Sequence, residues 1–240
     1  MTPYQTFLRI SFALVALVVS SQSKAAYPTK NEPFIDTPYH AGFYTGLGLG
    51  WGRQGLKSEK GLDTSTNNMV FLSPKKVNGF AGRWSLGYNM HTYFALELGV
   101  ASWQKGTYKE SIINGMATQL ATGTVTTKTR DVDALLKVMY PLQQNFNLFV
   151  KAGGAYVFSN TSVNSTLKSF APILNGKLSG KENRFYPEGA LGMDYRWDHR
   201  WSLGLHYHYI FGSNNHPLKG RTSPSLQLLL LNLQYDMASW

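Results

Sequence analysis

Apolar residues alternate with small or polar residues along most of the chain after residue 41. The first such stretch, GFYTGLGLGWG at 42–52, places its large side chains on one face and three glycines, Gly46, Gly48 and Gly50, on the other. A period of two predicts a β-strand. Because strand interiors normally avoid glycine, the glycine row indicates a narrow space in which side chains would collide.

The same alternation recurs in three hairpin-like units and in a last stretch at 225–237. The hairpins turn near residues 91, 143 and 199, which gives eight predicted strands in all. The four longer polar stretches between them are 53–77, 104–129, 159–183 and 212–224. Short turns alternating with long connections predict an up-and-down antiparallel meander. Long connections without secondary structure of their own are often functional.

Two architectures fit this pattern, and the face opposite the apolar one distinguishes them. A soluble ligand-binding barrel turns its apolar face inward, whereas a transmembrane barrel turns it toward lipid. The opposite face combines the glycine row with charged residues near the strand centres: Arg83, Glu97, Asp133, Lys137, Lys151, Glu188, Asp194, Arg196 and Asp236. We therefore predict an all-β fold, an eight-stranded antiparallel up-and-down transmembrane β-barrel, and keep the soluble barrel as the alternative.

Strand length and aromatic placement agree with a membrane barrel. Predicted strands of about ten to thirteen residues match the roughly 9–11 tilted residues that cross a bilayer. Aromatic residues gather at the predicted strand ends, where two interfacial girdles would lie. They are Trp51, Tyr88, Phe94, Trp103, Tyr140, Phe146, Tyr156, Phe158, Trp197, Trp201, Phe211 and Tyr235.

The first 25 residues have the pattern of a secretory signal peptide. Arg9 provides a positive start, 10–19 is an apolar run too short to span a bilayer, and Ser23 and Ala25 give a small-x-small cleavage site. Three prolines make 26–41 an extended periplasmic lead-in. The predicted organisation is signal peptide 1–25, lead-in 26–41 and outer-membrane barrel 42–240 with four extracellular loops.

The amino-acid composition excludes several kinds of chemistry and several fold classes. The chain of 240 residues contains no cysteine, which excludes disulfides, thiolate metal sites and thiol catalysis. Aromatic residues make up 14% and there are 23 glycines, which argues against a helical bundle. The mean hydropathy is −0.23 and no apolar run approaches about 20 residues, so a helical membrane protein is also excluded.

The charged lumenal residues predict a closed barrel. An eight-stranded barrel has an interior just wide enough to be filled by side chains. Charges buried there are expected to pair, because an isolated buried charge is strongly penalised. An ion-pair plug is therefore the first interpretation, and a narrow ion path is the alternative.

His206 and His208 share the lumenal face of one predicted strand. Two histidines so placed could ligate a metal or supply a general base. No serine nucleophile with an orienting carboxylate is recognisable beside them, so we interpret both as interior hydrogen-bond partners. The sequence predicts no catalytic residue, cofactor or metal site, and it holds no nucleic-acid recognition motif.

The formal charge of +10 arises mainly in the long polar stretches. The predicted basic rim comprises Arg53, Lys57, Lys60, Lys75, Lys76, Lys105, Lys109, Lys168, Lys177, Lys181, Lys219 and Arg221. Such a rim would meet lipopolysaccharide phosphates and acidic cell-surface glycans. Apolar islands at 112–113 and 170–174 would either contact partners or fold back over the barrel mouth.

Four segments carry a family resemblance: GFYTGLGLGWG, FALELGV, LFVKAGGAY and WSLGLHYHY. In order and spacing they resemble the first, third, fifth and seventh strands of eight-stranded outer-membrane barrels related to the OmpA transmembrane domain and the opacity-type surface proteins. The resemblance implies that the last strand is read by the barrel-assembly machinery. The matching residues are Leu229, Leu231, Leu233, Tyr235 and Met237. Met237 stands where the family has a terminal aromatic, and Trp240 could supply that aromatic after a register shift.

The resemblance also implies a function. We expect a non-catalytic surface or structural protein of a Gram-negative outer membrane, whose basic loops contact lipopolysaccharide, host surfaces or envelope partners. The alternatives are an enzyme that modifies outer-membrane lipid through His206 and His208, and a narrow pore for small solutes.

Overall fold

The computed structural model of the chain describes residues 41–56, 58–63, 68–113, 119–143, 145–164, 180–198, 200–212 and 225–237. The expected signal peptide, the lead-in except Ala41, and Trp240 lie outside the described residues.

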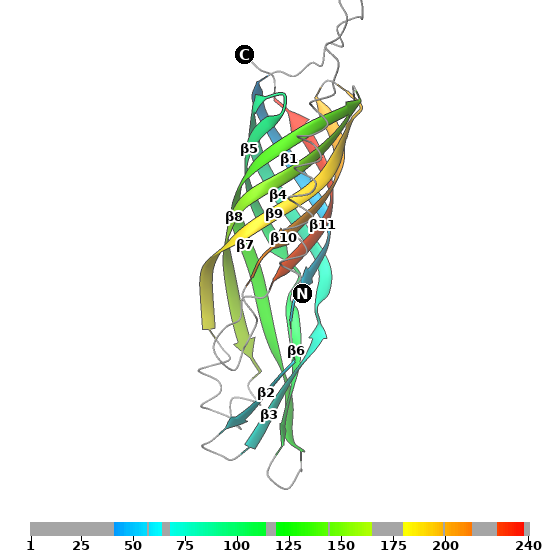
Figure 1. Ribbon diagram of the computed structural model, residues 1–240. Helices are drawn as coiled ribbons and strands as arrows, with labels where there is room; N and C mark the ends of the chain where they lie inside the picture. The colour runs from blue at the N-terminus through cyan, green and yellow to red at the C-terminus, as the bar shows by residue number, and fades with distance from the viewer. Residues whose placement is uncertain are drawn as a thin grey trace, which may run out of the picture.

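Eight strands close into an antiparallel barrel (Figure 1). They are β1 (Gly42–Gln54), β4 (Asn78–His91), β5 (Phe94–Trp103), β7 (Gln119–Gln143), β8 (Phe146–Val163), β9 (Gly180–Arg196), β10 (Trp201–Ile210) and β11 (Leu226–Asp236). The first and last strands pair from Tyr44 opposite Asp236 to Gln54 opposite Leu226, which seals the cylinder. The predicted fold class is confirmed.

The short turns lie together at one end, which we name the turn end. They connect β4 to β5, β7 to β8 and β9 to β10, close to the predicted positions 91, 143 and 199. β1 begins and β11 ends at this same end, because Tyr44 pairs with Asp236.

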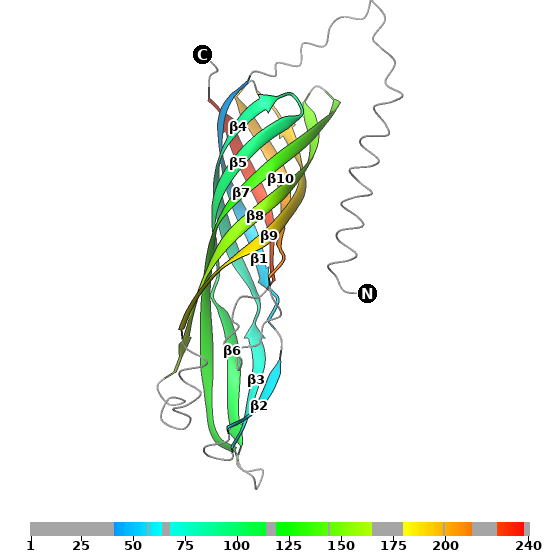
Figure 2. The same ribbon diagram turned by 60° about the vertical axis from the view of Figure 1, so that its left-hand side comes forward.

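At the opposite end the sheet continues well beyond the barrel (Figure 2). This extension comprises β2 (Glu59–Asp63), β3 (Asn68–Lys76), β6 (Gly106–Ile113) and the distal parts of β7 and β8, in the order β2–β3–β6–β7–β8. The expectation that 53–77 and 104–129 are connections without secondary structure was therefore wrong. Threonine, which favours strands, occupies five of the eight positions 122–129, and β7 continues through them to a length of 25 residues.

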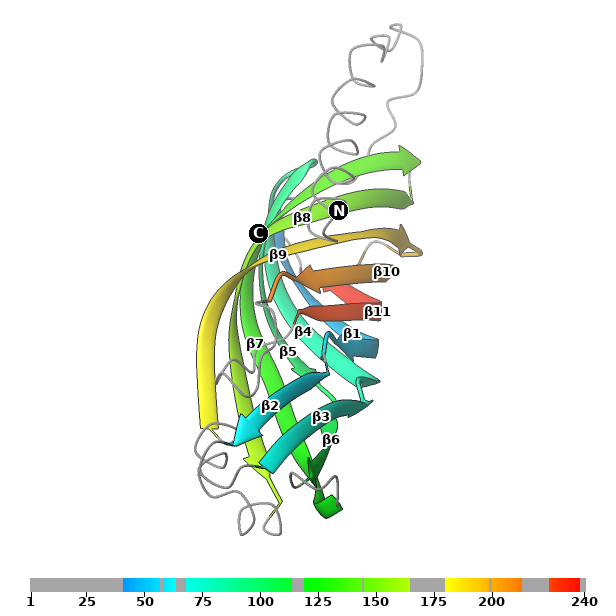
Figure 3. The same ribbon diagram turned by 60° about the horizontal axis from the view of Figure 1, so that its bottom comes forward.

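The extension is a curved sheet with a buried inner face (Figure 3). Leu72, Tyr108, Ile112 and Val125 are all buried there. Of the apolar islands, Ile112 is thus part of this inner face, whereas 170–174 lies outside the described residues.

The outside of the barrel is apolar. Phe80 and Leu98 expose about three-fifths of their surface, and large apolar side chains follow the outward positions of all eight barrel strands. The described part of the chain contains no helix that is long and apolar enough to cross a membrane.

The glycine row of β1 lies inside the barrel wall, as the sequence predicted. A Cβ at Gly46 would stand 2.8 Å from Ser85 Oγ, and one at Gly50 would collide with the backbone carbonyl of Leu229. Only a residue without a side chain lets β11 approach β1 this closely.

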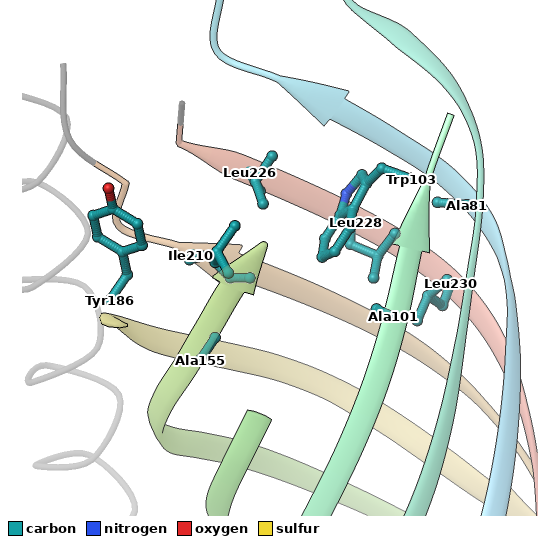
Figure 4. Close-up of a cluster of buried hydrophobic side chains, with 10 residues drawn as sticks. Ala81, Ala101, Trp103, Ala155, Tyr186, Ile210, Leu226, Leu228 and Leu230 are labelled. Atoms are coloured by element: carbon teal, nitrogen blue, oxygen red, sulfur yellow. The ribbon is translucent and has the colours of Figure 1, made fainter. Parts of the chain in front are cut away.

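The lumen is not uniformly polar. A cluster at the extension end contains Ala81, Ala101, Trp103, Ala155, Val157, Tyr186, Ile210, Leu226, Leu228 and Leu230. Figure 4 shows Trp103, Leu228 and Leu230 pointing into the lumen from β5 and β11. The expectation that Trp103 belongs to an interfacial girdle was wrong, because its position two residues after Ala101 puts it on the inward face.

Candidate functional site

A connected set of charged side chains occupies the middle of the lumen. Arg83 of β4 donates to Glu97 of β5, with Nη1 2.8 Å from Oε1. It also donates to Asp133 of β7 through Nη2 at 2.6 Å and Nε at 3.0 Å. All three side chains are buried. A guanidinium with two carboxylate partners has the planar donor geometry that makes such pairs strong.

Glu97 is the most heavily bonded carboxylate of the set. Lys151 Nζ lies 2.6 and 2.8 Å from its two oxygens, and the Tyr44 hydroxyl donates to Oε2 at 2.8 Å. Separately, Lys137 Nζ donates to Asp194 Oδ2 at 2.8 Å and stands 4.4 Å from the ring centroid of Phe149. Each of these lysines is buried but has a carboxylate partner.

The ion pairs lie between two apolar layers. A second buried cluster, Tyr44, Ala95, Met139 and Phe149, lies toward the turn end, and the cluster around Trp103 lies toward the extension. Along β5 the order is Ala95, Glu97, then Ala101 and Trp103. Apolar surroundings lower the local dielectric and strengthen the pairs.

His206 and His208 both bond to carboxylates. His206 Nε2 is 2.7 Å from Asp194 Oδ1, and His208 Nδ1 is 2.8 Å from Glu188 Oε1. Each residue is only 2% exposed. Within the described part of the chain, the second ring nitrogen of each histidine has no hydrogen-bond partner. A nucleophile activated by either histidine would have to bond there.

The last predicted lumenal pair lies at the turn end. Arg196 Nη2 donates to Asp236 Oδ2 at 3.1 Å, and Gln234 Nε2 donates to Oδ1 at 2.8 Å. Both charged residues are half-buried. All nine predicted lumenal charges thus lie inside the barrel or at its turn end, and each has a partner of opposite charge or, for Glu188, a histidine.

One lumenal carboxylate was not predicted from the sequence. Asp131 is buried on β7, and one carboxylate oxygen from each of Asp131, Asp133 and Glu188 lies within 4.8 Å of the other two. Asp131 stands two residues before Asp133 on the same face, and this parity is the signal that finds it.

The predicted basic rim is partly described. The side chains of Arg53, Lys75, Lys76, Lys105, Lys109 and Lys181 are exposed. The structure does not describe the side chains of the other six predicted rim residues, which are Lys57, Lys60, Lys168, Lys177, Lys219 and Arg221. Two further exposed basic residues, Lys128 and Arg130 on β7, join the rim.

Three rows of outward side chains cross β7, β8 and β9 beside this rim. Cross-strand pairing aligns Val132 with Tyr156 and Phe185, then Arg130 with Phe158 and Asn183, then Lys128 with Asn160 and Lys181. All nine side chains are exposed, and the rows follow one another toward the extension. We name this surface the graded face, because it changes from apolar to basic over three rows.

Glu110 is a buried carboxylate in the extension. It lies on β6 opposite Leu72 and Gly123, and its Oε2 has no hydrogen-bond partner within the described residues. Burial raises the pKa of this carboxyl from 4.5 to about 7.

The predicted assembly residues follow the outer face of β11. Leu229, Leu231 and Leu233 are exposed, and Tyr235 packs on Trp201 with ring centroids 4.8 Å apart. Met237 lies just beyond the strand, and its backbone NH donates to Phe43 O at 2.8 Å.

A closed antiparallel barrel that turns apolar side chains outward and encloses ion pairs is a transmembrane β-barrel. The chain belongs to the OmpA-like transmembrane domain family, whose family model matches residues 38–239. It is similar to an uncharacterized protein of Coxiella burnetii, at 25% identity, with 84% of this chain and 89% of that protein covered.

Other relatives agree on the class. Outer membrane protein A of Serratia marcescens is 22% identical over 80% of this chain and 48% of its own length, so the chain spans about half of that relative. Among solved structures, OprG of Pseudomonas aeruginosa superposes with a TM-score of 0.52 at 12% identity, over 83% of this chain and 98% of OprG. Neisserial surface protein A superposes with a TM-score of 0.51 at 11% identity, over 82% of this chain and 98% of that protein. The protein is an outer-membrane protein of the Gram-negative type.

Proposed function

We propose that this protein is a non-catalytic surface barrel whose graded face binds lipopolysaccharide through its phosphates. The observation that carries the proposal is the order of the three rows on β7, β8 and β9. Val132, Tyr156 and Phe185 match the acyl region, and the row with Arg130 matches the interface. Lys128 and Lys181 then stand at the height of the lipid phosphates.

The proposal places the extension outside the cell. Short turns and both barrel termini lie at the opposite end, which is the periplasmic arrangement in barrels of this class. The extension then presents exposed Lys75, Lys76 and Lys109 to host surfaces or envelope partners. The outward residues of β11 remain the proposed contact of the barrel-assembly machinery.

The lumen supports the absence of catalysis. Both histidines are buried and bonded to carboxylates, and apolar layers separate them from either end of the barrel.

Lipid A binding in detergent, measured by native mass spectrometry, tests the proposal. The test variant is K128Q/K181Q, and the matched control K75Q/K76Q removes the same charge from β3. Each basic residue near an anionic lipid surface contributes about 1 kcal/mol, so K128Q/K181Q should weaken binding by roughly tenfold or more. Removing one phosphate from lipid A should shrink this difference.

Binding to the control should stay near that of the unmodified protein. Equal losses in both variants would mean that net charge alone attracts the lipid, and the graded face would then have no special role. Binding that does not respond to salt would also reject a phosphate contact.

A further inference from the structure

The buried charges of the lumen do not balance. Three cations, Arg83, Lys137 and Lys151, face five buried carboxylates, which are Glu97, Asp131, Asp133, Glu188 and Asp194. Arg83 and Lys151 satisfy Asp133 and Glu97, and Lys137 satisfies Asp194. The two carboxylates that remain, Asp131 and Glu188, lie close together beside Asp133.

We propose that Asp131, Asp133 and Glu188 bind one divalent cation of the calcium class inside the barrel. Three carboxylates from β7 and β9 converge there. The five buried carboxylates of the described lumen exceed its three buried cations by two charges, which equals the charge of one such ion. This site is independent of the proposed lipid contact, which lies on the outer face of the same strands.

Buried oxygens without partners point to the same place. Asp131 is 1% exposed and its Oδ1 accepts no hydrogen bond, and Glu188 is 4% exposed with a free Oε2, within the described part of the chain. A buried carboxylate oxygen without a donor is strongly destabilising. His208 reaches only the other oxygen of Glu188, at 2.8 Å. A bound cation would compensate both free oxygens together.

The spacing suits a hard cation. Calcium binds oxygen at 2.3–2.6 Å, so two oxygens on opposite sides of one ion stand about 5 Å apart. One carboxylate oxygen from each of the three residues lies within 4.8 Å of the other two. Asp133 already accepts from Arg83 through both oxygens, but each carboxylate oxygen has a second lone pair.

Neutral oxygen donors are close by along the strands. The hydroxyls of Thr129 and Ser159 are buried and have no hydrogen-bond partner among the described residues. These two residues face each other across β7 and β8, and Thr129 is two residues from Asp131 on the same lumenal face. Calcium commonly completes its shell with neutral oxygens and water.

The rival explanation is that Asp131 and Glu188 hold protons instead of sharing an ion. A protonated pair would be insensitive to divalent cations, and amide substitution would mimic it. A calcium site instead links ion binding to folding, because an ion that binds only the folded state stabilises it. The two explanations therefore give opposite results in one experiment.

The test uses the full chain folded into detergent micelles free of lipopolysaccharide, because that lipid itself binds divalent ions. Folding is carried out with CaCl2, with MnCl2 or with EDTA, and free ion is then removed by desalting. Retained calcium is measured by elemental analysis and retained manganese by electron paramagnetic resonance. We expect about one ion per chain, and a loss of at least tenfold in D131N/E188Q.

The matched control is E182Q/D198N, which changes two carboxylates outside the cluster. It should retain the ion like the unmodified protein, and calcium should raise the heat-unfolding midpoint of both but not of D131N/E188Q. If the double variant fails to fold, D131N replaces it as the test variant. Ion retention by the unmodified protein then still tests the proposal. No retained ion in that protein, or equal retention in D131N/E188Q, would overturn the proposal.

Discussion

Arg83 and Asp133 meet inside the lumen through two parallel hydrogen bonds, from Nη2 to Oδ1 at 2.6 Å and from Nε to Oδ2 at 3.0 Å. The strands that carry them, β4 and β7, are separated in the barrel wall by β5. The pair therefore braces the barrel from within, and Arg83 extends the brace to Glu97 on the intervening strand.

Replacing Arg83 by methionine should be strongly destabilising. Asp133 would lose its cation in a buried site, and breaking one partner of a buried pair costs about 3–5 kcal/mol. Urea unfolding in detergent micelles measures the loss. R196M is the comparison, because Arg196 is half-buried at the turn end, and its effect should be about 1 kcal/mol or less. Equal effects would show that the central pair is not a brace.

The close approach of β1 and β11 predicts a glycine-specific defect. In G50A the new Cβ would meet the backbone carbonyl of Leu229, which no side-chain rotation relieves. The fraction of protein that reaches the heat-resistant folded form on gels should fall sharply. G82A is the control, because its Cβ would meet Leu49 at an ordinary 3.4 Å. Normal folding of G50A would contradict the predicted clash.

The extension should become less stable as the pH rises through the range 4.5 to 7. The pKa of Glu110 is about 7 in the folded state and 4.5 for an ordinary glutamate, so in this range the folded state holds more protons than the unfolded one. Stability is then highest below pH 4.5 and is lost as the pH approaches 7. Hydrogen exchange of the β6 amides, corrected for intrinsic rates, measures this. E110Q should flatten the pH dependence, and an unchanged slope would exclude Glu110 as its source.

A lumen crossed by ion pairs and two apolar layers should pass few ions. In planar bilayers we expect little or no stable conductance from the purified protein. K151M should raise it, since Glu97 then loses one of its two cations. Large regular openings in the unmodified protein would reject a closed lumen and favour the narrow pore.

Removal of both lumenal histidines should leave outer-membrane lipid unchanged. H206A/H208A breaks the bonds to Asp194 and Glu188, so some loss of stability is expected. Mass spectra of lipid A from cells that carry this variant should match those from cells with the unmodified protein. An altered lipid A profile at equal barrel abundance would support the enzyme hypothesis instead.

The pattern of alternation predicted the barrel wall because one side faces lipid and the other faces packed side chains. It failed where both sides of a strand are apolar. In LQLLLL at 226–231, Leu228 and Leu230 point inward while Leu229 and Leu231 point outward, and nothing in the local sequence separates the two pairs. The apolar layer at the extension end was therefore missed.

The partners within each ion pair could not be predicted from the sequence, for a different reason. Parity placed Arg83 and Glu97 on the inner face, but which inward side chains meet depends on the register and tilt of the strands in the closed barrel. Asp131 was missed because it lies at the edge of the stretch 104–129, which was expected to be a connection, whereas β7 already begins at Gln119. A polar segment that reads as a loop can remain in a sheet when neighbouring strands continue beside it.

The uninterrupted course of β7 has a mechanical consequence. Its 25 residues would span about 80 Å when fully extended, with β5 and β6 bonded in succession along one edge and β8 along the other. A load applied to the tip would be carried in shear by that row of bonds into the barrel wall, because β7 runs as one strand from the extension into the barrel. The extension is therefore expected to behave as a stiff projection that is continuous with the membrane-spanning barrel.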